Sequence, residues 1–443
     1  MKRHSRREFP WYSYENMSGE AAHVDLLQDL EWRGLVFQTT DREALAHRLR
    51  QGPITAYIGF DPTAESLHMG NLVGILMLRR LQLAGHHPIA VVGGATGLIG
   101  DPSFKSQERP LNTVETVHAW RDRIELQLRR FLDFDAVENP ARVVDNYDWT
   151  APIGVIEFLR DVGKHFSVNV MLNREAVASR LETGISYTEF SYMLLQARDY
   201  LELFRLHGCE LQMGGSDQWG NILAGVELVR RSDGGTAHAL TFPLITKSDG
   251  TKYGKTEGGA IWLDPEKMSV YHYYQFWLTV EDADVVALLK TFTFLSHGEI
   301  EDLAATTRER PAERRAQHVL AEHVTTLTHG REAMERARHL SELLFQGKVE
   351  ELSRDEVEDV FQDVPTADLS PDQALDIQSV LVLTGACPSR RQAREDIAAG
   401  AIYVNGHRMS GAEHVFSPSD CLFGRYLIIR RGRRRYFLAR LDR

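Results

Sequence analysis

The first clear pattern along the chain is an apolar strand followed by a helix with one apolar face. Residues 54–60 combine β-branched and aromatic side chains in a short run, which predicts a buried strand. Leucine and isoleucine then recur at helical spacing over 72–83, and Pro-Ile-Ala-Val-Val at 88–92 predicts a second buried strand. Strand, helix and strand at this spacing indicate a βαβ unit with a right-handed crossover, and therefore a parallel sheet.

Later segments continue this alternation and then change to helices alone. Strands are expected at 141–144, 210–213 and 240–245, and helices at 112–132, 152–162 and 187–207. Amphipathic helices follow from about 269 to 345, and an acidic stretch with two prolines comes next. From 374 onward the pattern is a basic helix and two hairpins, one of which turns at Asn405-Gly406. We therefore expect an α/β domain, a helical domain and a small α+β domain.

Charge is distributed unevenly along the 443 residues. The formal net charge is −11, but residues 388–443 hold 12 arginines against five acidic residues, a net charge of +7, so the remainder carries −18. A basic end on an acidic body indicates a polyanionic partner held at that end. The three cysteines are far apart in the sequence, which argues against a metal cluster or disulfides and fits a reducing cytoplasm. No apolar run approaches the roughly 20 residues of a membrane span, so no membrane association is expected.

The turn between the first strand and its helix contains Asp61, His68 and Gly70. A helix that begins at the carboxyl end of a parallel strand offers free N–H groups to phosphate, so this layout indicates a nucleotide site. Gly70 is expected to let a flat ring approach the backbone. The glycine-rich loop 93–102 has neither the P-loop lysine nor the dinucleotide spacing, and a tight turn is its simplest interpretation. Asp101 within it could hold the ammonium group of a ligand.

Tyr192, Gln196 and Asp199 fall at steps of four and three on the helix expected at 187–207, so they share one face. On spacing alone, a solvated face is the simpler interpretation. Their position directly before a strand whose end carries Asp217 and Gln218 instead favours a crevice between two strand ends.

A second glycine-flanked loop, 246–259, carries Lys252 and Lys255. A lysine pair is usually solvated surface. Directly after a sheet strand and hinged by glycines, this pair is better interpreted as a mobile cationic clamp for phosphate.

These motifs resemble the signatures of class I aminoacyl-tRNA synthetases. Residues 57–71, Tyr-Ile-Gly-Phe-Asp-Pro-Thr-Ala-Glu-Ser-Leu-His-Met-Gly-Asn, resemble the "HIGH" signature, and Lys-Tyr-Gly-Lys-Thr at 252–256 resembles a tyrosyl-type "KMSKS" signature. The likeness runs in order from about Leu26 to the C-terminus and is to bacterial tyrosyl-tRNA synthetases in particular. It implies a Rossmann-like parallel-sheet catalytic domain, an α-helical domain and a small C-terminal α+β RNA-binding domain.

The resemblance also implies a homodimer. Together with the sequence pattern, it divides the chain into five parts. They are an N-terminal extension that is expected to be flexible at 1–22 (with Met17 as an alternative start), the catalytic domain at 23–246, the KMSKS-type loop and α-helical anticodon-side domain at 247–349, an acidic linker at 350–373 and the RNA-binding domain at 374–443.

The implied reaction has two steps. Tyrosine attacks the α-phosphate of ATP to give tyrosyl-adenylate and pyrophosphate, and the tyrosyl group then passes to the 3′ end of tRNA(Tyr). ATP is a substrate that carries Mg²⁺ with it, and no protein-bound metal is expected. Because the attacking group is already a carboxylate, the first step needs no general base, only in-line positioning and stabilisation of charge on the phosphoryl group.

The resemblance assigns roles residue by residue. The phosphates are handled by His68, Lys105, Arg109, Lys252, Lys255 and Thr256. The ATP site comprises Gly59, Asp61, Thr63, His68, Gly70, Asn71, Asp217, Gln218 and Lys255. Tyrosine is held through its phenol by Tyr57 and Asp199, through its ammonium by Asp101, Tyr192 and Gln196, and near its carboxylate by Gln218. The C-terminal domain contacts RNA through Arg390, Arg391 and Arg394.

Three positions depart from some relatives: Ile58 stands in place of cysteine, Asn71 in place of a second histidine and Phe104 in place of glycine. Three alternative functions are weighed against this family. An adenylyltransferase for a small cofactor precursor would be shorter and lack the arginine-rich end. A tryptophanyl relative would not need Tyr57 and Asp199, and a non-catalytic RNA-binding paralogue would not need the phosphate-handling residues.

Overall fold

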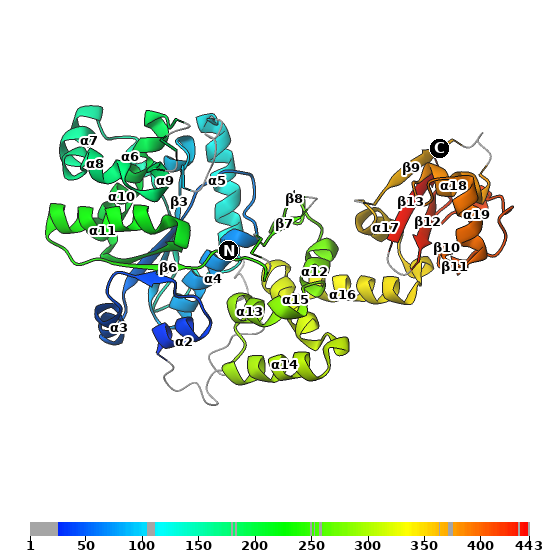
Figure 1. Cartoon of the computed structure of the whole chain (residues 1–443). Helices are drawn as coiled ribbons and strands as arrows, with labels where there is room; N and C mark the ends of the chain where they lie inside the picture. The colour runs from blue at the N-terminus through cyan, green and yellow to red at the C-terminus, as the bar shows by residue number, and fades with distance from the viewer. Residues whose placement is uncertain are drawn as a thin grey trace, which may run out of the picture. The chain divides into compact units, whose positions relative to one another are not determined.

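The computed structural model describes residues 25–103, 111–178, 180–181, 184–248, 250–251, 253–256, 259–362, 364–370, 375–432 and 435–441, with only the backbone for 175–176 and 255–256. These residues form two compact units (Figure 1). The first unit contains the chain up to Leu263 together with Asp282–Glu309, and the second contains Asp264–Glu281 and the chain from Arg310 onward.

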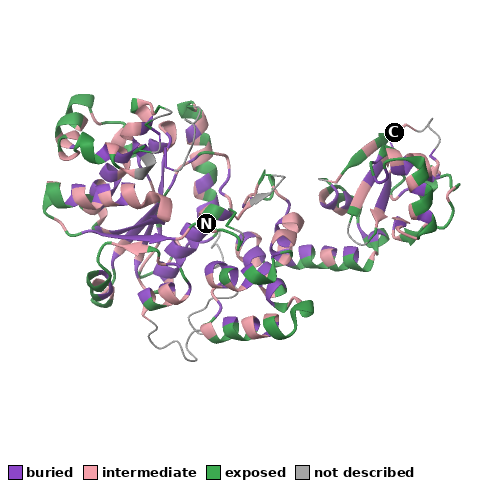
Figure 2. Cartoon of the chain, viewed as in Figure 1, coloured by how far each residue is buried: buried purple, intermediate pink, exposed green. Residues whose placement is uncertain are grey.

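A six-stranded sheet is the centre of the first unit, and Figure 2 shows its strands as largely buried. Its order is β1-β6-β5-β2-β3-β4, with β1 antiparallel to β6 and every other pair parallel. The strands are β1 (Gln38–Thr39), β2 (Thr55–Phe60), β3 (His87–Val92), β4 (Arg142–Asp145), β5 (Cys209–Gly215) and β6 (His238–Phe242). From β2 the chain moves outward through β3 to β4 and then returns to β5 on the other side. The switch point, where ligands of such sheets bind, therefore lies between β2 and β5.

Helices cover this sheet and confirm the predicted α/β class. α4 (Met69–Leu83) follows β2 and is buried along most of its length, while α10 (Tyr187–His207) and α11 (Trp219–Asp233) pack on each other. The other helices of the unit are α2 (Leu26–Trp32), α3 (Arg42–Arg50), α5 (Val114–Leu128), α6 (Tyr147–Thr150), α7 (Val155–Asp161), α8 (Val168–Leu172), α9 (Glu175–Ala178), α13 (Asp282–Phe292) and α14 (His297–Glu309).

Some element ends differ from the sequence prediction for local reasons. The helix expected at 112–132 is α5 at 114–128, because the hydroxyl of Thr113 accepts a hydrogen bond from Thr116 N and so caps the helix. The strand expected at 240–245 ends at Phe242, because Pro243 has no N–H to donate to a ladder.

The second unit joins a helical part to a small sheet. Its helices are α12 (Val270–Leu278), α15 (Arg315–His329), α16 (Arg331–Gln346), α17 (Arg354–Val360), α18 (Ile377–Leu383) and α19 (Arg390–Ala398). The sheet has the order β11-β10-β12-β13-β9, formed by β9 (Thr366–Leu369), β10 (Ile402–Val404), β11 (His407–Arg408), β12 (Tyr426–Arg431) and β13 (Arg435–Leu441).

The stretch at 350–373, expected to be an acidic linker, was predicted wrongly. It contains α17, and its strand β9 pairs in parallel with β13 of the small sheet. Leu340 and Leu344 of α16 share a buried cluster with Val357, Tyr426 and other residues of the small domain. Among the described residues of this segment, the acidic side chains are exposed or half-buried, whereas Leu352, Val357, Phe361 and Leu369 are buried. The segment is therefore part of the C-terminal domain. Within the part of the chain that is described, no helix is both long and apolar enough to cross a membrane.

Candidate active site

Polar side chains meet where β2 and β3 end. Asp61, directly after β2, accepts a hydrogen bond from Thr96 Oγ1 at 2.6 Å on one carboxylate oxygen and from Tyr192 Oη at 2.6 Å on the other. A Cβ at position 93 would lie 2.1 Å from Asp61 Oδ1, so only glycine lets the carboxylate approach the backbone this closely. The glycine-rich turn thus shapes the strand end for Asp61. The sequence assigned Asp61 and Tyr192 to different parts of the substrate, whereas here they bind each other.

Asp199 of α10 is bound by two donors from the segment after β4. Asn146 Nδ2 donates to one carboxylate oxygen at 2.9 Å, and Trp149 Nε1 donates to the other at 2.8 Å. Asn146 Nδ2 also lies 2.9 Å from Thr96 Oγ1, which makes a continuous polar network from Asp199 to Asp61. Sequence reasoning missed Thr96, Asn146 and Trp149. The position of Asn146 directly after a parallel strand was the signal that could have found it.

Tyr57 lies on β2, beside Gln212 of β5, at the predicted switch point. Its ring is buried and contacts Tyr200 edge-on at 5.3 Å between centroids. Its hydroxyl is buried and has no hydrogen-bond partner among the described residues. Burial, and then the negative charge of Asp199, raise the pKa of Tyr57 well above its usual value. Burial likewise raises the pKa of Asp199 to about 7, although the hydrogen bonds from Asn146 and Trp149 oppose the shift. The charge of Asp199 thus acts on the hydroxyl of Tyr57.

The shared face of α10 is not solvated. Tyr192 and Asp199 are buried, and Gln196 is half-buried with a side-chain oxygen that has no partner in the described part of the chain. Position before a sheet strand was therefore a better guide to this face than the spacing of polar residues.

Asp101 and Gln218 come together from two strand ends. Gln218 Nε2 donates to Asp101 Oδ2 at 2.8 Å, and Ser103 N donates to Asp101 Oδ1 at 2.9 Å. Asp217 is in the short 3-10 helix Ser216–Gln218 after β5, and a Cβ at Gly215 would lie 2.5 Å from Asp217 Oδ1. Glycine again lets a carboxylate pack closely against the strand end.

The start of α4 has the geometry of a capped helix N-terminus. His68 Nδ1 accepts a hydrogen bond from Gly70 N at 3.0 Å, and Asn71 Oδ1 accepts one from His68 N at 3.0 Å. Since Nδ1 is the acceptor, the proton of the neutral ring is on Nε2, which can donate to an anion. A Cβ at Gly70 would lie 2.9 Å from His68 Cε1, so this glycine makes room for the histidine ring of the chain itself. Asn71 stands where some relatives have a second histidine, and its side chain completes the cap.

Gly59 and Thr63 are the other two residues predicted to bind ATP, and both are exposed. Gly59 is exposed, and a Cβ there would meet no atom within 4 Å. Thr63 is exposed and its N–H donates to Asp61 O at 2.9 Å. Ile58, the second departure, is buried and faces Gly74 of α4, so it belongs to the core beneath the site.

The loop with the predicted lysines leads into a segment that pairs with the start of α4. Met69 N donates to Ile261 O at 2.8 Å, Leu263 N donates to Leu67 O at 2.9 Å, and His68 forms a β-bridge with Trp262. Lys255 and Thr256 form β7, which pairs with β8 (Gly259–Ala260). Lys252 lies outside the described residues, as do Phe104, Lys105 and Arg109.

The three arginines predicted to bind RNA are exposed on α19 of the second unit. Arg390 donates to Ser379 and Asp376, and Arg391 forms an ion pair with Glu395 at 2.9 Å. The side of α19 that includes Ala393 and Ile397 is buried in the core of the small domain. The arginines therefore lie on the exposed side of a helix whose other side is packed into the core of the small domain.

Comparisons with known proteins agree with this geometry. The family model described as tRNA synthetases class I (W and Y) matches residues 49–346, and the tyrosine–tRNA ligase SYY-like C-terminal domain matches 356–439. The tyrosine–tRNA ligase of Geobacillus kaustophilus is 57% identical over 418 residues, which cover 94% of this chain and 100% of that protein. The chain belongs to the tyrosyl-tRNA synthetases of class I. The family implied by the sequence motifs is thereby confirmed, and with it the aminoacyl-tRNA ligase class of enzyme.

Other tyrosyl-tRNA synthetases show the same relationship. Tyrosine–tRNA ligase 1 of Bacillus subtilis is 56% identical over 94% of this chain and 99% of its own length. A C-terminally truncated mitochondrial tyrosyl-tRNA synthetase of Aspergillus nidulans is similar in structure, with a TM-score of 0.67, 29% identity, and coverage of 75% of this chain and 97% of that one. Members of this family use ATP. In the structure the N–H of Gly70 at the start of α4, which the sequence predicted to be free for phosphate, donates to His68 Nδ1.

Proposed function

We propose that this ligase activates L-tyrosine with ATP and transfers the tyrosyl group to the 3′ end of tRNA(Tyr). The observation that carries the choice of tyrosine is the buried hydroxyl of Tyr57, which has no hydrogen-bond partner in the described chain. The carboxylate of Asp199 is also buried, and its charge acts on this hydroxyl. A phenol hydroxyl placed between them would donate to Asp199 and accept from Tyr57. Phenylalanine would leave both groups unpaired and dehydrated, which costs more than the absence of a contact.

The rest of the amino acid would bind along the same network. We assign the ammonium group to Asp101, Tyr192 and Gln196, and the region of the carboxylate to Gln218. Gln196 already presents a buried oxygen without a described partner, and Asp101 offers a carboxylate that Gln218 holds in place. An ammonium group supplies three donors and a positive charge, which suits a site this rich in oxygen acceptors.

ATP would bind at the start of α4, with Mg²⁺ carried on its phosphates. We assign its nucleoside to Gly59, Asp61, Thr63, Asp217 and Gln218, and its phosphates to His68, Gly70 and Asn71 together with Lys105, Arg109, Lys252, Lys255 and Thr256. In the first step a tyrosine carboxylate oxygen forms a bond to the α-phosphorus, and the bond from that phosphorus to the bridging oxygen breaks, releasing pyrophosphate. No proton moves in this step, so the protein contributes orientation and positive electrostatic potential.

Amino-acid-dependent exchange of labelled pyrophosphate into ATP tests the assignment directly. Tyrosine should support rapid exchange, phenylalanine and tryptophan very little. Exchange with tryptophan instead would identify a tryptophanyl enzyme, and a protein inert with every amino acid would support the non-catalytic paralogue. Charging of tRNA(Tyr) in the same preparation tests the second step.

The tRNA is assigned to the arginines of α19 among other groups. Arg390, Arg391 and Arg394 are exposed on the folded small domain, and lysine and arginine side chains of this kind bind phosphate. Replacing the three with glutamine should raise the KM for tRNA while leaving pyrophosphate exchange unchanged. If the triple variant charges tRNA as well as the wild type does, the assignment of these arginines to tRNA binding is wrong.

We also propose a cytoplasmic homodimer. Large apolar side chains are exposed close together in sequence on α7 and α8, both green over much of their length in Figure 2: Val155, Ile156, Leu159, Val168 and Val170. Ile156 alone is 76% exposed. Large apolar side chains that gather on one exposed surface mark an interface between proteins, so we assign the dimer contact to this segment. Sedimentation of the wild type and of Ile156→Glu tests this proposal. If both proteins are monomers, the proposed interface is excluded. The three cysteines are free, which fits a reducing compartment.

A further inference from the structure

Two buried guanidinium groups of the first unit bind the last turn of α13 and the chain just beyond it, in the same unit. Arg33 donates to Leu295 O at 2.8 Å and to Lys290 O at 3.2 Å, and Arg80 donates to Thr293 O at 2.5 Å. Both arginine side chains are only 5% exposed. Cationic donors at the last carbonyls of a helix satisfy groups that otherwise have no partner and interact favourably with the helix dipole. This end of α13 is therefore fixed.

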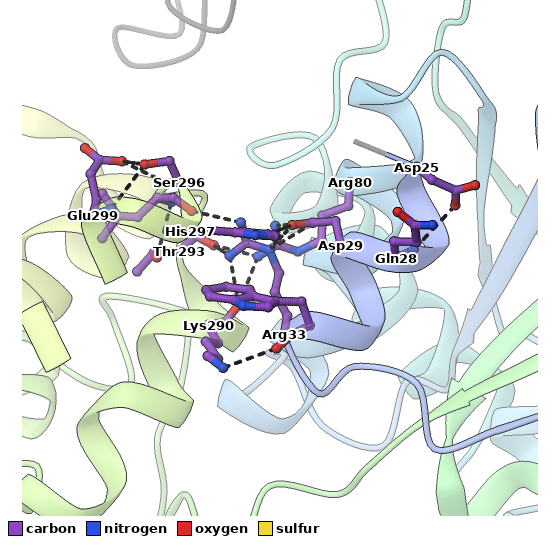
Figure 3. A network of polar contacts seen from close by, with 12 residues as sticks. Asp25, Gln28, Asp29, Arg33, Arg80, Lys290, Thr293, Ser296, His297 and Glu299 are labelled. Carbon is purple, nitrogen blue, oxygen red and sulfur yellow. Dashed lines mark hydrogen bonds and ion pairs between the residues drawn. The ribbon is translucent and has the colours of Figure 1, made fainter. Parts of the chain in front are cut away.

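A network around Asp29 reinforces the attachment, as Figure 3 shows. Asp29 accepts from Arg33 at 2.9 Å and lies 2.8 Å from His297 Nε2 at the start of α14. His297 stacks on Trp32 at 3.7 Å between ring centroids, and Lys290 Nζ lies 4.2 Å from the Trp32 ring centre. α2 and α4 together thus hold the segment that joins α13 to α14.

The other end of α13 holds the lysine-bearing loop. Asp284, in the first turn of the helix, is buried, and its Oδ1 accepts a hydrogen bond from Ser248 N at 2.9 Å. Ser248 lies in the loop that follows β6, four residues before Lys252. Asp284 Oδ2 is also buried and has no hydrogen-bond partner among the described residues. A buried carboxylate oxygen without a partner is costly unless some other demand retains it.

We propose that Asp284 is a positioning residue for the lysine-bearing loop, an inference that rests on the proposed role of that loop in ATP activation. α4 carries His68 at its first end and Arg80 near its last, and Arg80 is bound to the chain just beyond α13. Asp284 at the opposite end of α13 then fixes the base of the loop. The packed helices α4 and α13 thereby fix the position of the loop relative to the "HIGH" segment.

The physical basis is the rigidity of α13. Val285, Leu288, Leu289 and Phe292 of this helix are all buried, so the helix cannot move without disturbing the core. Groups that act on a phosphoryl transition state tolerate little displacement, and an error of about 1 Å can cost about a hundredfold in rate. A single hydrogen bond at the loop base can therefore have a large kinetic effect.

Three substitutions separate positioning from simple stabilisation of α13. Asp284→Asn keeps an oxygen that can accept from Ser248 N. Asp284→Ala removes it. Asp284→Glu keeps a carboxylate at the helix N-terminus, which preserves the favourable charge there, but displaces it by one methylene group. Asp41→Ala is the matched control, since Asp41 caps α3 of the same unit with a 2.9 Å hydrogen bond to Ala44 N.

The measurement is tyrosine-dependent pyrophosphate exchange, with the equilibrium Kd for tyrosine and the melting temperature determined for each variant. We expect Asp284→Ala and Asp284→Glu to lower kcat about tenfold or more, with the Kd for tyrosine within about twofold of the wild type. Asp284→Asn should stay within about threefold in kcat, and Asp41→Ala should match the wild type. Asp284→Ala should also cost much less in a Lys255→Ala background, because the group it positions is then absent.

Other results would overturn the inference. A kcat for Asp284→Glu equal to that of the wild type would leave only helix stabilisation, and equal costs of Asp284→Ala with and without Lys255 would show that Asp284 does not act through the loop. If Asp284→Ala does not fold, the Glu and Asn variants decide. A wild type without tyrosine-dependent exchange would instead contradict the proposed function itself, so the two failures are distinguishable.

Discussion

Replacing Asp199 with alanine tests the origin of specificity for tyrosine. The carboxylate is buried, and its two oxygens are held by Asn146 and Trp149. In the proposed complex the phenol hydroxyl of tyrosine donates to this carboxylate, a hydrogen bond to a charged group worth about 1.5–3 kcal/mol. Because phenylalanine makes no such bond, Asp199→Ala should reduce the ratio of kcat/KM for tyrosine over phenylalanine by roughly 10- to 150-fold.

The same substitution has a structural cost that must be separated from specificity. Among the described residues, it leaves Asn146 Nδ2 with only its Thr96 partner and Trp149 Nε1 with no partner. A buried unsatisfied donor costs about 1–3 kcal/mol. A lower melting temperature is therefore expected. Pyrophosphate exchange with each amino acid should be measured well below that temperature.

Trp149→Phe is the matched control for this experiment. It removes one donor to Asp199 but leaves the carboxylate, so the ratio of tyrosine to phenylalanine should change by less than about threefold. Equal losses of kcat/KM for both amino acids in Asp199→Ala would refute the assignment of Asp199 to the phenol, because the residue would then support the fold alone.

Three further predictions concern the pH dependence of stability, the turn at Gly93 and the C-terminal domain. Burial raises the pKa of Asp199 to about 7 from 3.8, so the folded protein binds this proton more tightly than the unfolded chain. The melting temperature of the wild type should therefore fall as pH rises from 5 to 8, more steeply than that of Asp199→Asn. Gly93→Ala would place a Cβ 2.1 Å from Asp61 Oδ1 and should destabilise by about 1–3 kcal/mol, whereas Gly298→Ala, with no atom within 4 Å, should be neutral in the same thermal melts. Deleting residues 348–443 should leave pyrophosphate exchange intact but impair charging of tRNA, whereas a cut at 374 should yield a less stable protein, because it removes β13 and exposes β9.

Much of the fold follows from local pattern. The apolar runs at β2 and β3 and the leucines of α4 were sufficient to predict a parallel βαβ unit, since fully buried strands and helices have distinctive periods. What local pattern could not supply was β9. Its acidic, proline-flanked sequence resembles a linker, and its pairing with β13 depends on a partner far along the chain.

The functional site likewise has features that the sequence predicted and features that only the structure shows. The family resemblance assigned Asp61, Tyr192 and Asp199 to the site, but it did not indicate that Asp61 and Tyr192 bind each other. Asn146 and Thr96 come from two loops, each set by the order of strands in the sheet, so their contact is a product of topology. Sequence resemblance thus identified residue types, and the structure supplied their partners.

The network also explains why two acidic residues can stand so close at the edge of one sheet. The charge of Asp61 contributes to the raised pKa of Asp199, and Thr96 and Asn146 stand between them as neutral donors. Neutral donors offset only part of the cost of burying two carboxylates. In the proposed complex, the ammonium group of tyrosine would bind among Asp101, Tyr192 and Gln196 and supply the missing positive charge. We therefore expect substrate binding to offset this electrostatic cost, and we expect a ligand with both a cation and a phenol to be favoured over a ligand with only one of them.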